Sequence, residues 1–351
     1  MKHRSRVSAD TVLAWPPSAD RSVAAALGVS AATPPPAPLD SLDSALLDLL
    51  AVDGRMTNRE LAAATGASSA TVGSRIRRLV ADRVLIFTAL FDWERAGFGW
   101  FVVATITVEG RSVREVANEV AALGECVGLA TVLGSADLLG YFLVADRAEL
   151  RRLSTERLGD VRGIGTVRMD LATDSTVTGL GRRFFLVRGE PLIRLPEPVI
   201  ELDDLDTRIV AELLCDGRRS NRHIARKLDV SEGAVRTRLH RMTDSGLFCI
   251  EAMIEPTALG LVGALATVRI RADRNRVDRI AEAASRIAGV LLVASVVGDA
   301  EMVVAIGAAD QFQLLAVIRE GIRMLDGVRS VETHQMVEIV KFTPYFKRLD
   351  R

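Results

Sequence analysis

The hydrophobic pattern of the chain changes from helical to strand-like spacing partway along, and it does so twice. Leu42 and Leu46 recur at helical spacing, and the segment 205–213 repeats that spacing. The apolar positions alternate over residues 86–92 and again over 249–255, as they do in a short strand. The pattern therefore predicts two consecutive units, each helical at its start and rich in strands afterwards.

Capping signals divide the helical part of each unit into three short helices. Thr57 and Glu60 have the spacing of a capping box for a second helix, which Gly66 ends. Ser68 and Ser231 stand where the N-cap of a third helix belongs in the two units. Two helices joined by such a short turn form a helix-turn-helix, and the alternating segment that follows the third helix predicts a wing.

The remainder of each unit predicts the order strand, helix, strand, strand, helix, strand. This βαββαβ order is typical of a ferredoxin-like domain, in which one antiparallel sheet carries both helices on one face. The predicted fold class is α+β, with two tandem units that each join a winged helix-turn-helix to a ferredoxin-like domain. The predicted elements are 100–108, 112–123, 126–133, 137–144, 147–158 and 164–172 in the first unit, and 264–271, 273–288, 290–297, 301–307, 310–325 and 328–338 in the second.

The two units also match residue by residue, which indicates an internal duplication. When residue 42 is set against residue 205, Asp53–Arg55 aligns with Asp216–Arg218 without a gap, and both segments read Asp-Gly-Arg. Proline-rich stretches separate the units from each other and from the N-terminal segment. The predicted boundaries are a flexible arm at 1–38, winged helix-turn-helix domains at 39–92 and 203–255, ferredoxin-like domains at 97–178 and 260–342, a linker at 179–202 and a tail at 343–351.

The outer face of the third helix carries residue types that read DNA. Arginine can donate two hydrogen bonds to a guanine edge in the major groove, and serine or threonine can reach bases or phosphates. Arg75 and Arg238 lie at the border of the apolar face, so they serve either DNA phosphates or an internal ion pair. A solvated helix face without DNA is the competing interpretation. The candidate DNA-binding residues are Ser68, Ser74, Arg75, Arg77, Arg78, Ser231, Arg236, Thr237, Arg238, His240 and Arg241.

The overall composition neither supports nor opposes DNA binding. Lys and Arg number 45, as do Asp and Glu, so the net charge of zero excludes a wholly basic coat protein but not a local basic patch. Apolar residues make up 49% and charged residues 26%, as in an ordinary globular chain. Aromatic residues, at 5%, are too few to favour a stacking platform for single-stranded nucleic acid.

The two units resemble the leucine-responsive/asparagine-operon regulator family (Lrp/AsnC) of transcription factors. The resemblance rests on Leu42-Asp43, Asp53–Arg55, Asn58 and the run from Ser68 to Arg78, and on their counterparts in the second unit. It implies a winged helix-turn-helix that binds double-stranded operator DNA, and a ferredoxin-like domain that dimerises and senses a ligand. A fused pair implies an intramolecular pseudo-dimer with its two sheets packed on each other, which can assemble into a further homo-oligomer. Two reading helices then meet half-sites about one DNA turn apart.

The same resemblance implies an amino-acid effector, because many members bind one at a subunit interface. Family members commonly have Gly-Asp-x-Asp at the turn between the second and third strands, whereas this chain reads Gly-Ser-Ala-Asp and Gly-Asp-Ala-Glu. Glycine allows a tight turn with exposed amides for a carboxylate, and an acid can meet an ammonium group. The alternative is a plain hairpin with solvated acids. The candidate effector-binding residues are Gly134, Asp137, Gly298, Asp299 and Glu301.

An enzyme is the main alternative, because sirohaem decarboxylases resemble this two-part fold and also occur as fused pairs. Those enzymes depend on a His-Asn-Tyr segment around the second strand, and neither 127–132 nor 290–295 contains His, Asn or Tyr. The four histidines do not cluster in the sequence, so no catalytic residue is assigned. A further alternative is a sensing module whose helix-turn-helix domains bind protein.

Cysteine spacing and hydropathy set the remaining expectations. Cys126, Cys215 and Cys249 lie far apart with no CxxC pair, so neither a metal site nor a cofactor nor a disulfide framework is expected. The apolar runs are shorter than a membrane span requires, and Asp10 and Pro16 interrupt any signal-peptide core. A cytoplasmic protein without a membrane partner is therefore expected.

Overall fold

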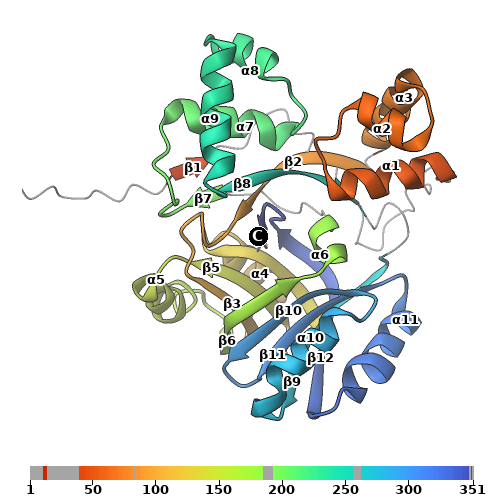
Figure 1. Cartoon of the computed structure of the whole chain (residues 1–351). Coiled ribbons are helices and arrows are strands. Elements are labelled where there is room, and N and C mark those ends of the chain that lie inside the picture. Colours follow the sequence, from red (N-terminus) through yellow and green to blue (C-terminus); the bar gives the residue numbers. More distant parts are fainter. Residues whose placement is uncertain are drawn as a thin grey trace, which may run out of the picture.

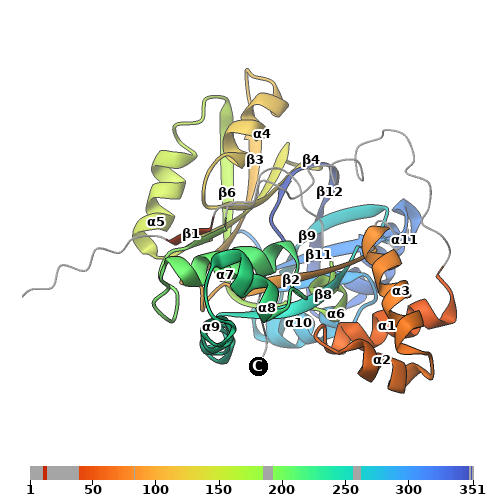
Figure 2. The same ribbon diagram turned by 90° about the horizontal axis from the view of Figure 1, so that it is seen from above.

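Two helix-turn-helix domains lie above a large β-barrel that carries helices on its outside (Figure 1). The structure, a computed structural model, describes residues 11–13, 39–82, 84–184, 193–255, 262–347 and 349. Figure 2, seen from above, shows the two helix-turn-helix domains set apart, with strands β2 (Leu85–Asp92) and β8 (Phe248–Ile254) running between them.

Each helix-turn-helix domain consists of three helices, as the capping signals predict. Thr57 accepts a hydrogen bond from the Glu60 amide, and Ser68 and Ser231 accept one from the amides three residues ahead. Gly66 ends the second helix at a φ of 73°, a left-handed conformation that glycine adopts without strain. The helices are α1 (Ser41–Val52), α2 (Asn58–Thr65) and α3 (Ser69–Ala81) in the first domain, and α7 (Asp204–Cys215), α8 (Asn221–Leu228) and α9 (Glu232–Asp244) in the second.

The two ferredoxin-like copies form a single closed antiparallel barrel, with the strand order β10-β11-β9-β12-β4-β5-β3-β6. The first copy supplies β3 (Trp100–Val108), β4 (Cys126–Leu133), β5 (Leu138–Val144) and β6 (Ile164–Val177). The second supplies β9 (Ala264–Ala272), β10 (Val290–Val297), β11 (Met302–Ala308) and β12 (Val328–Phe342). The outer helices are α4 (Val113–Ala121), α5 (Arg147–Arg152), α10 (Val277–Ser285) and α11 (Gln311–Ala316), with short helical turns at Leu153–Arg157, Arg274–Arg276, Val317–Gly321 and Ile322–Met324.

The last strand of each copy pairs within its own sheet and, over its far end, with an edge strand of the other copy. β6 pairs with β10 and β12 pairs with β4, so the sheets join edge to edge rather than only packing on each other as expected. This pairing satisfies backbone groups that an open sheet edge would leave to solvent. It also explains why β6 and β12 extend to Val177 and Phe342, beyond the ends predicted at 172 and 338.

The strands that follow α3 and α9 pair with each other instead of forming separate wings, which corrects that part of the sequence prediction. β2 is antiparallel to β8, and a short strand near the C-terminus, β13 (Phe346–Lys347), adds to β2 in parallel. Seven of the eight side chains of β2 are buried, on both faces of the strand. A strand with two apolar faces needs cover on both sides, which the helices above and the barrel below provide.

The repeated Asp-Gly-Arg turn is a packing element of this shared sheet. A Cβ on Gly54 would lie 2.5 Å from the Ala252 amide nitrogen, and a Cβ on Gly217 would lie 2.9 Å from that of Thr88. Each turn thus needs glycine because it contacts the strand of the other unit. The first helix of each domain therefore packs on the strand contributed by the other domain.

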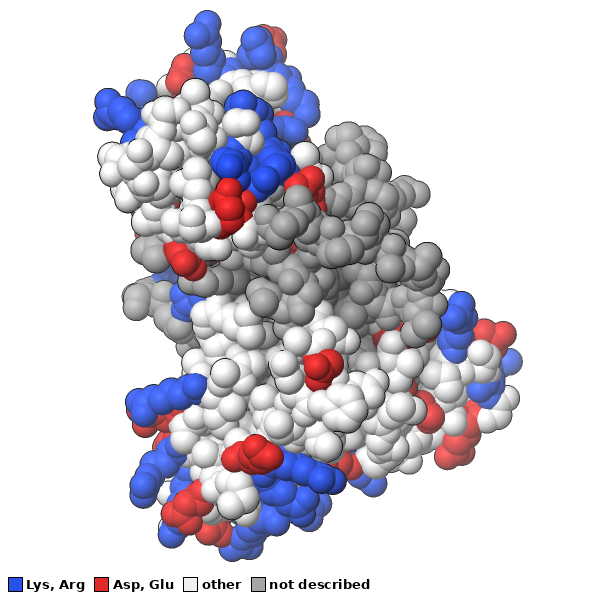
Figure 3. All heavy atoms as spheres, turned by 90° about the vertical axis from the view of Figure 1, so that its right-hand side faces the viewer, with Lys and Arg blue, Asp and Glu red and all other residues white. Residues whose placement is uncertain are grey.

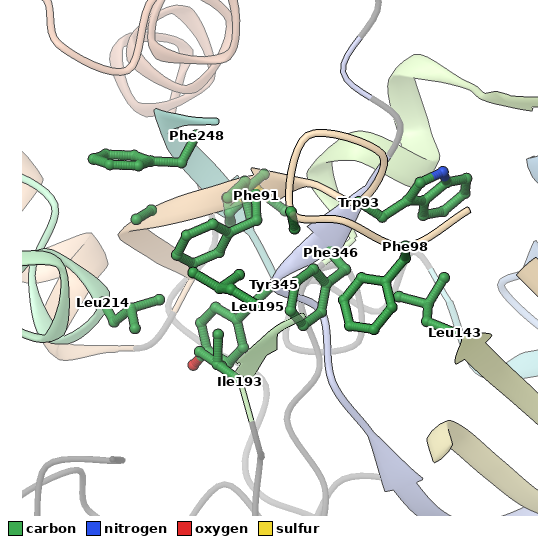
Figure 4. Close-up of a cluster of buried hydrophobic side chains, with 14 of the residues drawn as sticks. Phe91, Trp93, Phe98, Leu143, Ile193, Leu195, Leu214, Phe248, Tyr345 and Phe346 are labelled. Carbon is green, nitrogen blue, oxygen red and sulfur yellow. The ribbon is translucent and has the colours of Figure 1, made fainter. Parts of the chain in front are cut away.

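Beneath the sheet, aromatic and aliphatic side chains from distant segments form one core (Figure 4). Phe91 lies between Phe248 and Phe346, with ring centroids 5.7 and 5.8 Å away. Tyr345 and Phe346, which the sequence places in a tail, are both buried here.

The segments predicted as arm and linker also contribute secondary structure. β1 (Thr11–Leu13) pairs with β7 (Ile193–Leu195), and α6 (Gly179–Arg183) directly follows β6. The rest of 1–38 lies outside the described residues, so its predicted flexibility stays a prediction.

Candidate DNA interface and effector site

The outer faces of α3 and α9 present the polar residues that the helical period predicts. Ser74 and Arg77 on α3 are exposed, as are Arg236, Thr237 and His240 on α9. Neither Arg77 nor Arg236 has an ion-pair partner among the residues that the structure describes. Figure 3 shows Lys and Arg side chains at the upper end of the molecule, the level at which the helix-turn-helix domains lie, and a second group at the lower end.

Arg75 and Arg78 turn toward the first helix of their own domain. Arg75 Nη1 lies 2.5 Å from Asp40 Oδ2 and 3.2 Å from Asp43 Oδ2, and Arg78 also donates to the Asp43 carboxylate. Asp40 and Asp43 form the capping box of α1, and the Asp43 side chain is fully buried. The two arginines therefore attach α3 to the N-terminus of α1.

The second domain repeats the same ion-pair network. Arg238 Nη1 lies 2.6 Å from Asp203 Oδ2 and 2.9 Å from Asp206 Oδ1, and Arg241 donates to Asp206 as well. Hydrogen bonds from Arg238 and from the Asp206 amide hold the pKa of Asp203 below its usual value. Of the two roles left open for Arg75 and Arg238, the structure shows the internal ion pair. Arg78 and Arg241, predicted to contact DNA, are held in the same networks.

Exposed arginines on the second helix of each domain were missed by the sequence interpretation. Arg59 on α2 and its counterpart Arg222 on α8 are exposed, as is Arg226 one turn further along α8. None of the three has an ion-pair partner within the described parts of the chain. The Asn-Arg match at 58–59 and 221–222 was the available signal, because it recurs in both units without an apolar role.

The turn of the second copy, at residues 298–301, already binds a carboxylate from the first copy. Asp170 Oδ1 accepts hydrogen bonds from the amides of Asp299 and Ala300 at 3.0 and 3.4 Å. A Cβ on Gly298 would lie 2.3 Å from the same oxygen, so glycine is required for this approach. The amides expected to receive an effector carboxylate are thus occupied by Asp170.

A buried ion pair holds that carboxylate in place. Asp170 and Arg269 make a bidentate pair with N···O distances of 2.7 and 3.1 Å, and their side chains are 1% and 4% exposed. Arg269 also donates to Glu332 at 3.0 Å. Burial tends to raise the pKa of Glu332, but a hydrogen bond from Ser135 and the charge of Arg269 outweigh it and lower that pKa.

The acids at the ends of the two turns serve the backbone. Asp137 accepts a hydrogen bond from the Val108 amide at 2.7 Å, and Glu301 accepts one from the Ala272 amide at 3.1 Å. Gly134, at the start of the first turn, has a φ of 154° and lies against β12. Both acids therefore fasten a hairpin to the end of a neighbouring strand.

A polar cleft of about 390 Å³ opens beside the second turn and is the remaining candidate for an effector. Asp299, predicted in this role, lines it with a side chain that is 56% exposed. The sequence interpretation missed the basic part of its wall. The other lining residues are Arg168, Arg269, Arg271, Ala300, Ser330, Val331 and Glu332.

Neither a metal-binding group nor a membrane helix is found in the described segments. The search found no set of three or more His, Cys, Asp or Glu side chains placed to hold a metal ion. Among the same residues, every helix is too short or too polar to cross a bilayer.

Comparison with known protein families matches the units separately. The AsnC-type helix-turn-helix domain matches residues 39–80 and 202–243, and the Lrp/AsnC ligand binding domain matches 102–179. A C-terminal dimeric alpha+beta barrel domain of AsnC-type regulators matches 264–346. The chain belongs to the Lrp/AsnC family. It is a tandem duplication of that family's two-domain unit, in a family of transcriptional regulators with a DNA-binding helix-turn-helix.

Relatives with one such unit align with part of this Lrp/AsnC chain. An HTH-type transcriptional regulator of Pyrococcus abyssi is 33% identical over 147 residues, which are 42% of this chain and 93% of that protein. The HTH-type transcriptional regulator FL11 of Pyrococcus horikoshii is 28% identical over 128 residues, 36% of this chain and 84% of that one.

A solved structure matches nearly the whole Lrp/AsnC chain. The siroheme decarboxylase NirDL covers 88% of this chain and 95% of its own, with a TM-score of 0.61 and 15% identity. At that identity the likeness concerns the fold alone.

Proposed function

We propose that this Lrp/AsnC chain regulates transcription by binding operator DNA with both helix-turn-helix domains. The observation that carries the proposal is that the arginines of each domain fall into two sets, one paired and one unpaired. One set is fixed internally by Asp43 or Asp206, and the other set stands unpaired on the outer faces of the second and third helices. Unpaired arginines at these positions can reach phosphates and base edges in the major groove.

The second domain offers the stronger contact surface. Arg222, Arg226 and Arg236 are exposed there, against Arg59 and Arg77 in the first domain. Ser68 and Ser231 accept their capping bonds through Oγ, which leaves the hydroxyl hydrogen of Ser231 able to meet a phosphate.

Fluorescence anisotropy with bound genomic fragments tests this proposal. The slope of the logarithm of the binding constant against the logarithm of salt should become shallower by about one for each phosphate-contacting arginine removed, as in Arg222→Ala and Arg226→Ala. Arg279→Ala, an exposed arginine on α10 of the barrel, is the matched control and should leave the slope unchanged. An affinity that changes neither with the salt concentration nor in these variants would contradict DNA binding and favour a protein partner.

We further infer that a small zwitterion such as an amino acid binds in the cleft beside the 298–301 turn. Arg168 and Arg271 can receive its carboxylate, because Arg269 is already committed to Asp170. Asp299 can receive its ammonium group, because Glu332 is already bound by Arg269 and Ser135. The predicted roles of Gly134, Asp137 and Glu301 are replaced here, since the structure gives these residues backbone contacts.

A panel of amino acids in a thermal-unfolding assay tests the effector. One of them should raise the melting temperature, because binding to the folded state alone stabilises it. Asp299→Asn and Arg271→Gln should each reduce the gain, whereas Glu282→Gln, an exposed acid on α10, should not. If no amino acid raised the melting temperature, the effector proposal would be contradicted. DNA binding is tested separately by the anisotropy measurement.

The decarboxylase alternative rests on the fold. The second strands of the two copies, β4 and β10, contain no His, Asn or Tyr, the residue types on which that chemistry depends. We infer that the chain is not an enzyme. Consumption of iron-bearing tetrapyrrole substrate by the purified protein would overturn that inference.

A further inference from the structure

A mainly apolar cavity of about 150 Å³ opens into the barrel interior, near the end covered by the shared sheet. It lies apart from the polar cleft beside the 298–301 turn and shares no lining residue with it. Both copies contribute to its wall, from β3 to β6 of the first and β9 to β12 of the second. In Figure 4, Phe346 and Phe98 lie side by side below the sheet, and Phe346 is part of the cavity wall.

The cavity arises because the two copies have diverged at matching positions of the barrel interior. In the first copy, Phe101 and Tyr141 lie on the interior faces of β3 and β5. The strand registers place Leu265 and Ala305 at the equivalent positions of β9 and β11. A homodimer would carry the same side chain in both halves. The fused chain instead fills the interior from the first copy and leaves space in the second.

One wall of the cavity is a column of stacked aromatic rings. Trp93 stacks on Phe101 with centroids 5.2 Å apart and an interplanar angle of 15°, and Phe101 stacks on Tyr141 at 5.9 Å and 4°. Both faces of Phe101 are covered by its neighbours, so a further planar ring would meet the edges or an end of this column, in the edge-to-face or offset geometry that aromatic rings prefer. The shape of the wall therefore suits a flat aromatic molecule.

The charged groups in the wall are already bound to the protein. Lys347 Nζ donates to the carbonyl oxygens of Gly181 and Phe184 at 2.8 and 3.0 Å, and Lys341 Nζ donates to that of Ala121 at 2.7 Å. No acid is among the described residues that line the cavity. A carboxylate or an ammonium group would therefore enter without a partner, which is costly in an apolar site.

Thr343 supplies the one polar group of the described wall that lacks a partner. Its backbone amide donates to the Val127 carbonyl at 2.7 Å, while its hydroxyl is buried without a hydrogen bond. A ligand that supplies a hydrogen-bonding partner to such a buried hydroxyl is bound more tightly for it.

We propose that the barrel cavity binds a small, uncharged, planar aromatic molecule that carries a single hydrogen-bonding group, with its ring beside the column of Trp93, Phe101 and Tyr141 and its polar group near Thr343. An apolar space of this volume can hold a ligand about as large as benzene. This site goes beyond the proposed regulator function, because a zwitterionic effector has no place in it. Ligand binding here stabilises the barrel next to Phe346, which belongs to the sheet shared by both helix-turn-helix domains.

Thermal unfolding and calorimetry of the full chain with indole test the site. Indole should bind saturably and raise the melting temperature, whereas indole-3-acetate and tryptophan should not act through this site because each carries charge. Ala305→Leu fills the cavity and should abolish the gain from indole. Ala122→Leu, the same change at an exposed position after α4, is the control and should retain it.

Thr343→Val removes the hydroxyl group but keeps the volume of the cavity nearly unchanged, so it tests the hydrogen bond alone. The variant should bind indole about fivefold more weakly, as expected for one hydrogen bond, and should bind toluene as tightly as the parent chain. Because the hydroxyl has no partner to lose, the variant should fold normally, so it remains informative if Ala305→Leu does not fold. The proposal would be overturned if indole did not bind, or if indole raised the melting temperature of Ala305→Leu as much as that of the parent chain. Since no DNA is present in these measurements, that failure is distinct from a failure of the regulator function.

Discussion

At the scale of single residues, Asp43 and Asp206 show what sequence periodicity leaves undecided. Helical spacing correctly turns Ser74, Arg77 and Arg236 outward, and it places Arg75 and Arg238 at the border of the apolar face. It does not reveal their partners, because each arginine meets an aspartate 32 residues earlier in the chain. The Leu-Asp repeat was visible in both units, but its role requires the folded arrangement of the first and third helices.

Asp206→Ala should therefore destabilise the second helix-turn-helix. It removes one half of a capping box and leaves Arg238 and Arg241 without their shared carboxylate. We expect the free energy of unfolding to fall by about 2 kcal/mol, measured by urea denaturation. Asp204→Ala, at a neighbouring side chain that is 87% exposed, should change it by less than about 0.5 kcal/mol. Equal losses in the two variants would contradict a buried network.

His334 gives the chain a dependence on pH at the junction of the two copies. Its ring is buried, its Nδ1 has no partner in the described structure, and burial lowers its pKa below the usual 6.5. The unfolded chain then binds a proton that the folded chain does not, so stability should fall as the pH drops below about 6.5, by at most about 1.4 kcal/mol per pH unit. Urea denaturation from pH 7.5 to 5 measures this slope.

His334→Gln should flatten that slope, because glutamine does not titrate. His223→Gln, at an exposed position of α8, should leave the slope as it is. If the slope persists in His334→Gln, another group is responsible for it.

At the scale of secondary-structure elements, the sequence predicts the strands best where a glycine turn follows them. β3, β4 and β10 have the predicted ends, because the apolar period and the turns after β4 and β10 agree. β13 was missed, since a strand of two residues is too short to show a period. The predicted wings were wrong for a similar reason. A lone apolar strand does not show in its sequence whether its neighbour comes from the same unit or the other.

The buried position of β13 predicts a large effect of a change near the C-terminus. Phe346→Ala should lower the free energy of unfolding by about 3–5 kcal/mol, because Phe346 contacts Phe91 and Phe98 in the core beneath the sheet. Phe312→Ala, at a residue that is 85% exposed, should lie within about 0.5 kcal/mol of the parent. Chemical denaturation compares the two, and a small loss for Phe346→Ala would show that β13 is dispensable.

At the scale of the whole molecule, each copy forms its own four-stranded sheet, and the two sheets close into a barrel only by pairing with each other at both edges. The duplication in the sequence predicts the pairing of two units, but not the edge pairing of β6 and β12 with the other copy or the ion pair from Asp170 to Arg269 that crosses between the copies. Such contacts join residues that are 99 or more positions apart in the sequence, and the two partners belong to different units. The interior cavity also depends on both copies, because strands with different side chains from the two copies line it.

Separation of the units should therefore produce association. Residues 39–178 expressed alone expose the edges of β4 and β6, which the full chain pairs with β12 and β10. We expect sedimentation velocity to show self-associated dimers or larger species of this half, and a complex of one copy each when the half 193–351 is added. A folded monomer of the first half would contradict the dependence of the barrel on both copies.

The fusion also gives the molecule a polarity. In a dimer of identical subunits the two reading helices are interchangeable, so a protein turned end for end on its operator is unchanged. Here one outer face carries Ser74 and Arg77 and the other carries Arg236, Thr237 and His240, while the shared sheet keeps them in one chain. A non-palindromic operator would therefore be read in a single direction, and the protein would distinguish the upstream from the downstream side of a promoter.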